Sequence, residues 1–358
     1  MEKKQWYKDK VFYQIWPRSF KDGNGDGMGD LLGVYEKLDY IKSLGCDGIW
    51  FSPIYPSPGA DCGYDIANYM DIAPEFGGME AFKKVLEGVH ARGMKLLMDL
   101  VVNHTSDEHD WFQKSRRRID PYTDYYIWRP AKPDGKLPNN WDSLFEGKAW
   151  TWDEVRGEYY MHLFAIKQPD LNMDNPLVRE EVKKIMRFWL EMGVDGFRED
   201  VITYISKAKG LPDDHLFPIY KGMPKYNHGP HIHEYLMEFK RDVFDHYDCM
   251  TLAESPMVTP KTALTYIDEE TYMNSGEFLV TGQKLEQATL TAILNVITTE
   301  KINVTFVDDN LDNRLNKTLV STLTNNAYTV NFTSLSLEEI PEESEFLVLF
   351  APNADMSE

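Results

Sequence analysis

Acidic residues stand at the ends of two strand-like runs, where a parallel sheet would bring them together. The run GVDGFRED (193–200) ends at Asp200, and the run CMTLAES (249–255) carries Glu254 near its end. Two carboxylates on adjacent strands suit glycoside hydrolysis, because one attacks or stabilises the oxocarbenium centre and the other protonates the leaving oxygen. Arg198 precedes Asp200 by two residues, so we expect its charge to lower the pKa of Asp200 and keep this group ionised. A single acid at a strand end is more often a cap or an ion-pair partner, so the interpretation depends on the combination.

The stretch DGNGDGMGD (22–30) alternates oxygen-bearing residues with glycines and is a candidate metal loop. In a tightly curled loop the alternate side chains turn toward one centre, and a backbone carbonyl adds a further ligand. Such oxygen ligands suit a hard cation, Ca²⁺ or Mg²⁺. The candidate ligands are Asp22, Asn24, Asp26, the Met28 carbonyl and Asp30. An EF-hand is a poor match because the glutamate at its twelfth position is missing, and spacing alone leaves a solvated turn of Gly and Asp open.

Composition restricts the partners of the chain. Its 358 residues include 38 basic and 58 acidic side chains, and the net charge of −20 would repel nucleic acid. The basic run KSRRR (114–118) is too short to reverse this. No apolar stretch is long enough to span a bilayer or follows the basic N-terminus as in a secretory signal. Three cysteines cannot all pair and show no C-x-x-C spacing, so we expect a cytoplasmic protein. The charge and the lack of a long apolar stretch predict that neither nucleic acid nor a membrane is a partner.

Repeated βα units are the elements that would position the acidic pair. Short apolar runs alternate with segments of helical periodicity, which indicates a parallel sheet, and the simplest closed form of such units is a (β/α)8 TIM-type barrel. The third strand would add Asp99 and, just beyond it, His104 to the strand ends. The expected strands lie in 11–16, 48–54, 95–102, 193–200 and 249–255. The expected helices are Leu32–Leu44, Gly78–Arg92, Leu177–Met192 and Pro230–Tyr247.

Two segments depart from this alternation. Residues 104–172 are rich in Trp, Tyr, Asp, Pro and Asn, and a loop of that length inside a compact domain is usually functional, so we expect an inserted subdomain on the catalytic face. A helix (282–297) and three strand-like runs (303–307, 328–333 and 345–350) then predict a β-rich C-terminal module. The expected domains are the first part of the barrel (1–103), the insertion (104–172), the continued barrel (173–275) and the C-terminal module (276–358).

Several motifs, in order along the chain, resemble glycoside hydrolase family 13, the α-amylase superfamily, and within it the oligo-1,6-glucosidase group. They are VFYQIWPRSF (11–20), GYDI (63–66), DLVVNHTS (99–106), QPDLN (168–172), GFREDVI (196–202) and AESP (253–256). The resemblance covers about residues 5 to 270, and the ordered set is more specific than any one motif. It implies a glycosidase that acts on the non-reducing end of short oligosaccharides, with a structural Ca²⁺ or Mg²⁺ ion in the loop after the first strand.

Roles for individual residues follow from the resemblance. It implies a retaining mechanism in which Asp200 is the nucleophile and Glu254 the general acid and base. The residues that it places around the terminal glucosyl ring are Asp61, Tyr64, His104 and Arg198, with Phe145, Phe164 and Gln168 from the insertion. QPDLN and Val201, directly after the implied nucleophile, are similar to the forms found in enzymes that prefer α-1,6 over α-1,4 linkages. An apolar Val at this position cannot make the hydrogen bond that a Thr there could make. His104 could also be a structural histidine.

The sequence departs from the family pattern in three ways. Glu199 stands where an apolar residue is frequent, and Cys62 where an Asn is usual. The third departure is the lack of the Asn-His-Asp motif, whose Asp would bind the sugar more tightly in the transition state. The nearest string, FVDDNLDNR (306–314), has Leu311 at that position, which leaves Asp308, Asp309 and Asp312 as substitutes. The loss of such a contact predicts turnover slower by roughly a hundredfold to a thousandfold.

The barrel is expected to be incomplete, because five units and the insertion already occupy residues 1–260 of a fold that needs eight. One alternative to an α-1,6-glucosidase is a non-catalytic sugar-binding relative. Another is a trehalose-6-phosphate hydrolase, which the sequence does not exclude. The two carboxylates favour an enzyme, whereas the missing Asp and the missing units favour the non-catalytic relative. A transporter-associated relative would need a membrane helix, which the sequence lacks.

Overall fold

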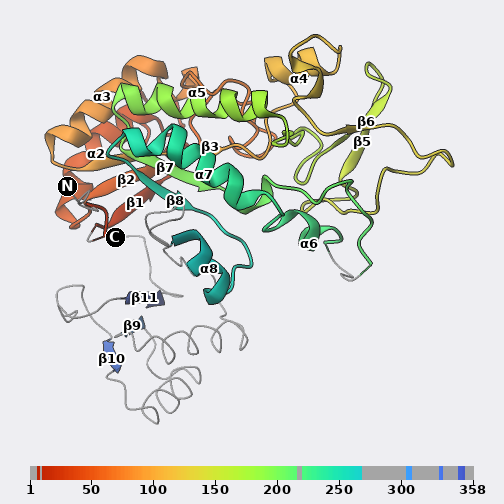
Figure 1. Ribbon diagram of the computed structural model, residues 1–358. Helices are drawn as coiled ribbons and strands as arrows, with labels where there is room; N and C mark the ends of the chain where they lie inside the picture. Colours follow the sequence, from red (N-terminus) through yellow and green to blue (C-terminus); the bar gives the residue numbers. More distant parts are fainter. Residues whose placement is uncertain are drawn as a thin grey trace. The chain divides into compact units, whose positions relative to one another are not determined.

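The structure is a computed structural model that describes residues 6–8, 10–215 and 220–267 and three further strands. Described residues up to 257, with 265–267, belong to one compact unit (Figure 1). Residues 258–264 and the three strands belong to a second unit. The expected helix at 282–297 lies outside the described residues. The domain boundaries expected from the sequence remain a prediction.

A parallel five-stranded sheet forms the centre of the first unit, in the order β1-β2-β3-β7-β8. Each strand lies within one of the five apolar runs that were expected to form strands, and so the repeated βα pattern is confirmed. The register places Asp99 beside Arg198, and Glu199 beside Ala253. The C-terminal ends of the third, fourth and fifth strands therefore lie next to one another. The strands are β1 (Phe12–Ile15), β2 (Gly48–Phe51), β3 (Lys95–Val101), β7 (Gly196–Asp200) and β8 (Met250–Ala253).

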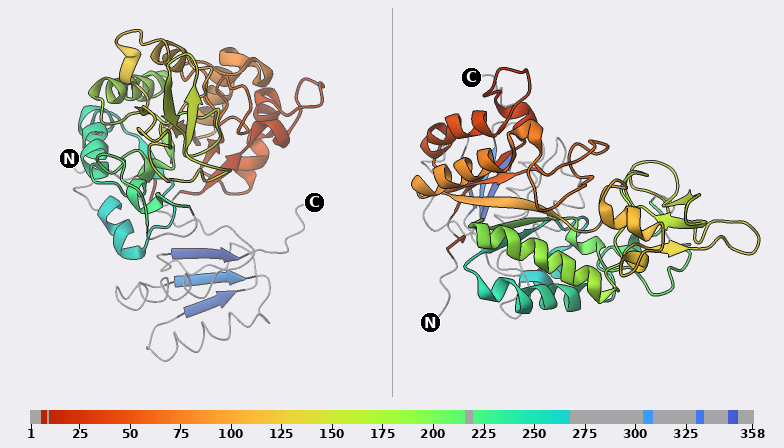
Figure 2. Two further views of the ribbon diagram at one scale, coloured as in Figure 1. Left: turned by 90° about the vertical axis from the view of Figure 1, so that its right-hand side faces the viewer. Right: turned by 90° about the horizontal axis from the view of Figure 1, so that it is seen from above.

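Amphipathic helices cover one face of this sheet. Helices α2 and α3 pack together beside the first strands, and α5 and α7 beside the last ones (Figures 1 and 2). The main helices are α2 (Leu31–Ser43), α3 (Gly78–Ala91), α5 (Pro176–Met192) and α7 (Ile232–Asp242), and each expected helix agrees with one of them apart from a few terminal residues. The shorter helices outside the segment between β3 and α5 are α1 (Pro17–Phe20), η1 (Pro74–Phe76), η3 (Ile202–Tyr204), α6 (Met223–Tyr226) and η4 (Phe244–His246). A further helix, α8 (Pro260–Ile267), has residues in both units.

Alternation along the strands gives the sheet two different faces. Leu96, Met98 and Phe197 are buried in the large core beneath the helices. Their neighbour Leu97 belongs to a separate cluster on the opposite face, with Trp50 of β2, Met250 of β8 and Tyr7. Asp99 is two residues from Leu97 on β3 and lies on the same face, and Arg198 and Asp200 alternate with Phe197 on β7. The polar cluster therefore lies on the face that the helices do not cover.

The segment between β3 and α5 forms a small subdomain with its own sheet. Its strands pair antiparallel in the order β4-β6-β5, away from the parallel sheet (Figure 1). A buried aromatic cluster that includes Trp141, Trp150 and Tyr226 packs beside this sheet. The elements are α4 (Asp110–Ser115), η2 (Tyr122–Asp124), β4 (Trp128–Arg129), β5 (Trp150–Asp153) and β6 (Glu158–Met161).

Three strands of the second unit form a separate parallel sheet in the order β10-β9-β11. β10 and β11 fall within the predicted runs 328–333 and 345–350, and β9 overlaps the run 303–307 and ends one residue beyond it, so these three strands are confirmed. The strands are β9 (Val304–Asp308), β10 (Val330–Thr333) and β11 (Phe346–Phe350).

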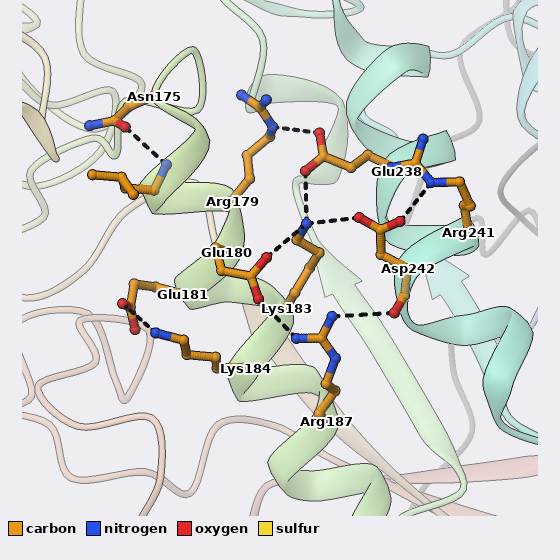
Figure 3. Close-up of polar contacts among 11 residues, drawn as sticks. Asn175, Arg179, Glu180, Glu181, Lys183, Lys184, Arg187, Glu238, Arg241 and Asp242 are labelled. Atoms are coloured by element: carbon orange, nitrogen blue, oxygen red, sulfur yellow. Dashed lines mark hydrogen bonds and ion pairs between the residues drawn. The ribbon is translucent and has the colours of Figure 1, made fainter.

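Ion pairs join α5 to α7 on the outer layer (Figure 3). Lys183 is almost fully buried, and its Nζ lies 3.0 Å from Glu180, 3.0 Å from Glu238 and 2.9 Å from Asp242. Side-chain hydrogen bonds from Arg241 and Lys183 lower the pKa of Asp242 well below its ordinary value. By contrast, Lys184 on the same helix is half-exposed and bonds only Glu181 among the described ion pairs, at 2.9 Å.

Substitution of Lys183 tests how much this network stabilises the fold. Lys183→Ala leaves three carboxylates without their shared cation, so we expect the free energy of unfolding to fall by about 1–3 kcal/mol. Lys184→Ala is the matched control, with an expected change within about 0.5 kcal/mol. Urea unfolding at pH 7 measures both, and equal losses in the two variants would contradict the expectation.

Acid should remove part of this stabilisation. The folded-state pKa of Asp242 is depressed, so its contribution is complete above the unfolded pKa of about 4 and is lost as pH falls below it. The difference between the wild type and Lys183→Ala should therefore narrow when unfolding is measured at about pH 3.

Candidate active site

Arg198 gathers three carboxylates at the ends of adjacent strands. Its Nη1 lies 3.0 Å from both Asp99 oxygens and 2.6 Å from Asp200 Oδ1. Its Nη2 lies 2.6 Å from Glu254 Oε2. The guanidinium also lies over the ring of Trp50, 5.1 Å from its centroid. The predicted residues Arg198, Asp200 and Glu254 are therefore brought together, and the parallel register adds Asp99 to them.

One positive charge faces three acids, and most of the cluster is buried. Burial raises the pKa of Asp99 to about 6, although Arg198 opposes this shift. Burial also raises the pKa of Asp200 above its ordinary value, again against the effect of Arg198. The expectation that Arg198 gives Asp200 a lowered pKa is therefore wrong, because the cost of removing the carboxylate from water exceeds the attraction of a cation shared with two other acids.

A sharp turn at Val201 fixes the acid on the next strand. Val201 follows Asp200 with φ of 35° and ψ of 39°, a left-handed conformation that β-branched residues rarely adopt. This turn directs the backbone N–H of Val201 to Glu254 Oε2, at 3.1 Å. The N–H of Glu254 in turn donates to the Glu199 carbonyl, at 2.9 Å. Main-chain bonds thus place Glu254, whose side chain keeps 41% of its surface exposed.

A second polar group lies where the insertion returns to the barrel. Gln168 Nε2 lies 2.8 Å from Asp61 Oδ2 and 3.1 Å from His104 Nε2. Burial lowers the pKa of His104 to about 4, so this imidazole is neutral at pH 7. His104 and Gln168 are fully buried, whereas Asp61 is partly exposed. Asp61 is therefore the member of this group that a ligand can reach. Gln168 contacts it directly, and His104 contacts Gln168 from behind.

The segment 61–64 connects the two groups. The Tyr64 hydroxyl lies 3.4 Å from Asp99 Oδ2, and its ring lies 6.0 Å from the Arg198 guanidinium carbon. The carboxylate of Asp65 accepts the backbone N–H groups of Ala60 and Asp61, at 2.8 and 3.0 Å. These bonds hold the loop in a conformation that places Asp61 beside Gln168 and Tyr64 beside Asp99.

Two predicted aromatic residues extend from the second group. The Phe164 ring lies 4.9 Å from the ring of His104, and the Phe145 ring lies 5.5 Å from that of Phe164. Phe145 is more than half exposed. A line of rings therefore leads from buried His104 to solvent, as expected for an apolar surface that receives a sugar ring.

Sequence reasoning missed Lys207. This buried lysine follows η3, and its Nζ lies 2.8 Å from Asp170 Oδ2 and 2.7 Å from Asn103 Oδ1. Asn103 in turn lies 3.3 Å from His104 Nδ1. Asp170 and Asn103 both lie within motifs quoted above, but Lys207 belongs to none of them, so only the fold shows that it joins the barrel to the insertion.

The loop 22–30 follows α1 and is closed by its own hydrogen bonds. Asp22 accepts the backbone N–H groups of residues 24, 25 and 27, and this bonding lowers its pKa. Asn24 Nδ2 donates to Asp26 Oδ2 at 3.0 Å, and Asp30 caps α2 through the N–H of Gly33 at 2.7 Å. Within the described ranges, no three His, Cys, Asp or Glu side chains are grouped to hold a metal ion. The oxygen donors fit a hard cation chemically, but binding would require the Asn24–Asp26 bond to open.

The parallel sheet, the insertion after its third strand and the acids at its strand ends define the class of protein. The alpha-amylase catalytic domain family matches residues 14–336, and the chain belongs to this family. Its fold is accordingly that of a (β/α)8 barrel, of which the described residues contain five parallel strands.

Particular relatives narrow the comparison. The chain is 57% identical over 267 residues to an oligo-1,6-glucosidase of Parageobacillus thermoglucosidasius, a match that covers 74% of this chain and 47% of that protein. It is 56% identical to an oligo-1,6-glucosidase of Bacillus cereus, over 75% of this chain and 48% of the relative. A solved structure of Bacillus licheniformis trehalose-6-phosphate hydrolase shares 48% identity with a TM-score of 0.72, over 74% of this chain and 47% of the other. The chain thus spans about half the length of the relatives that it matches.

Among the helices that the structure describes, none is both long and apolar enough to cross a membrane.

Substitution of Asp99 tests the charge balance of the cluster. The folded carboxyl releases its proton near pH 6 and the unfolded one at about pH 4, so between these values the folded state binds more protons and the free energy of unfolding falls as pH rises. Asp99→Asn removes this contribution, so the fall should become shallower. Urea unfolding at pH 4, 5 and 6 measures the slope. Asp71→Asn, at an exposed carboxylate, is the control, and an unchanged slope in Asp99→Asn would refute the assignment.

Proposed function

We propose that this chain hydrolyses α-glucosidic bonds, with a preference for α-1,6 bonds, at the non-reducing end of short oligosaccharides. The observation that carries the proposal is the placement of Asp200 and Glu254 on adjacent strand ends, both held by Arg198. The oligo-1,6-glucosidases at 57% and 56% identity support it. The apolar side chain of Val201 beside Asp200 supports the linkage preference, since it offers no hydrogen bond to the departing sugar.

The geometry supports a retaining mechanism with two carboxylates. Arg198 occupies Asp200 Oδ1, which leaves Oδ2 to attack the anomeric carbon and form a glycosyl ester. Arg198 and the Val201 N–H both bind Glu254 Oε2, so Oε1 is the oxygen that carries the proton to the leaving group. Glu254 then removes a proton from water, whose oxygen bonds to the anomeric carbon while the bond from that carbon to Asp200 Oδ2 breaks, which releases the sugar and restores the Asp200 carboxylate. The raised pKa of Asp200 means that the nucleophile is lost by protonation as pH falls.

Binding of the terminal glucosyl ring would use the second polar group. We assign hydrogen bonds to its hydroxyls to Asp61, backed by Gln168 and His104, and stacking to Tyr64 and to the rings of Phe164 and Phe145. Asp308 ends β9 in the second unit, and Asp309 and Asp312 lie outside the described residues. A third carboxylate for the transition state is therefore not assigned.

Trehalose-6-phosphate hydrolysis is the second candidate, because one solved relative with a TM-score of 0.72 carries that name. The two candidates share the acid pair and differ in substrate. A comparison of isomaltose, maltose and trehalose 6-phosphate under the same conditions separates them.

Release of p-nitrophenol from its α-glucoside tests the activity directly. We expect slow turnover in the wild type and a further loss of at least about a thousandfold in Asp200→Asn, because the ester cannot form. Glu254→Gln should also lose activity, whereas Asp71→Asn should keep it. Isomaltose should be cleaved faster than maltose. A wild-type rate equal to that of Asp200→Asn, with isomaltose still bound, would instead identify a non-catalytic sugar-binding protein.

We also propose that the loop 22–30 binds Ca²⁺ or Mg²⁺ in a structural role. Its support is the donor set of Asp22, Asn24, Asp26, Asp30 and the Met28 carbonyl, and the charge on Asp22 that its backbone bonds favour. A cytoplasmic location is proposed on the odd number of cysteines and the lack of C-x-x-C spacing.

Removal of the ion should lower thermal stability, because an ion that binds only the folded loop adds its binding free energy to folding. Calcium at about a hundred times its Kd contributes about 2.7 kcal/mol, so EDTA should lower the melting temperature by several degrees and excess Ca²⁺ should restore it. Asp22→Asn should show a smaller response to EDTA. A melting temperature that neither EDTA nor Ca²⁺ changes would rule out the site.

A further inference from the structure

A hollow of about 450 Å³, largely open to solvent and called the cavity below, lies in the inserted subdomain, and none of the strand-end residues lines it. Its wall comes from the loop after β4, the approach to β5, strand β6 and the loop after η3. The lining residues that matter here are Lys132, Lys136, Leu137, Lys148, Tyr159 and Asp213. The volume is within the range of small-molecule sites and holds a sugar of one or two rings.

The lining of this cavity contains more lysines than carboxylates, although the chain as a whole is acidic. Three lysines and one aspartate line it, whereas the chain carries −20. Lys132 lies 3.6 Å from Asp213, and Lys136 lies 2.7 Å from Asp134. Lys148 forms a close ion pair with Asp142. These pairs are partly or largely exposed and contribute little, and each ammonium group has three protons, so each lysine can donate to a further anion while it keeps its carboxylate.

The walls of the cavity are fixed without a ligand. The N–H of Lys132 donates to the Lys136 carbonyl at 3.0 Å, which closes the turn that carries both lysines. Asn140 holds the opposite loop, because its N–H lies 2.9 Å from Asp213 Oδ1 and its side chain bonds the backbone of Asp214 at 2.7 and 2.8 Å. The lysines therefore stand on a preformed frame, which lowers the entropy lost when a ligand binds.

Tyr159 and Leu137 give the cavity an apolar and aromatic side. Tyr159 stands opposite Trp152 on the neighbouring strand, and their rings contact edge to face with centroids 5.1 Å apart. This pair holds the Tyr159 ring in place. An aromatic face suits the C–H surface of a pyranose ring, whereas ammonium groups suit a phosphate.

We propose that this cavity binds a phosphorylated sugar, with the phosphate on Lys132, Lys136 and Lys148 and the ring against Tyr159. A large polyanion is excluded as the ligand, because the net charge of the chain repels it at longer range. The site is separate from the hydrolytic centre and does not depend on the activity proposed for that centre.

Calorimetric titration of the full chain with glucose 6-phosphate, inorganic phosphate and glucose tests the proposal. We expect saturable binding of glucose 6-phosphate, at least tenfold weaker binding of phosphate, and weaker binding still of glucose at this site. The affinity should fall in about 0.5 M NaCl, because the lysines are exposed to solvent. Equal affinity for phosphate and glucose 6-phosphate would overturn the role of the ring.

Variants locate the binding. The double variant Lys132→Gln/Lys148→Gln should weaken glucose 6-phosphate binding at least tenfold, and Lys136→Gln alone, at a largely exposed lysine, should weaken it severalfold. Lys184→Gln is the matched control on α5 and should leave the affinity unchanged. Tyr159→Ala should weaken glucose 6-phosphate more than phosphate. No saturable binding, or binding that survives the lysine variants but is lost in Asp200→Asn, would overturn the proposal.

Discussion

A single guanidinium group holds the candidate active site together. Arg198 lies between Asp99 and Glu254 and bonds Asp200 on its own strand, so it joins the third, fourth and fifth strands at their ends. The two acids of the proposed reaction are therefore positioned by one cation whose charge is smaller than theirs combined. Burial, together with the surplus negative charge, holds the pKa values of Asp99 and Asp200 above their ordinary range.

The remainder of the first unit serves to keep this cluster in register. Helices that pack on one face of the sheet leave the other face to the polar residues, and the insertion brings Gln168 and Asp61 together above it. Lys207 plays a comparable role between the insertion and the barrel, because it binds Asp170 from one and Asn103 from the other. Two buried cations thus connect segments that lie about a hundred residues apart in the sequence.

The apolar pattern predicted the five strands, the four main helices and the positions of Asp200 and Glu254 at strand ends, because hydrophobic periodicity is a local property. It did not predict the direction of the pKa shift at Asp200 or the part played by Lys207. Both depend on how deeply a side chain is buried and on partners distant in sequence, which only the packed fold determines. The loop 22–30 shows the same limit. Its spacing indicated ligands, but the capping of α2 by Asp30 is a use that the spacing did not reveal.

The bond from the main chain of Val201 to Glu254 affects how sequences of this kind can diverge. Every amino acid except proline supplies a backbone N–H, so exchange of the side chain at this position leaves the contact to the acid in place. Val201, next to the proposed nucleophile, therefore combines a backbone contact that is fixed with a side chain that can vary. A substitution can therefore change the side chain, and with it the linkage preference that we propose, while the geometry of the Glu254 carboxyl group stays the same.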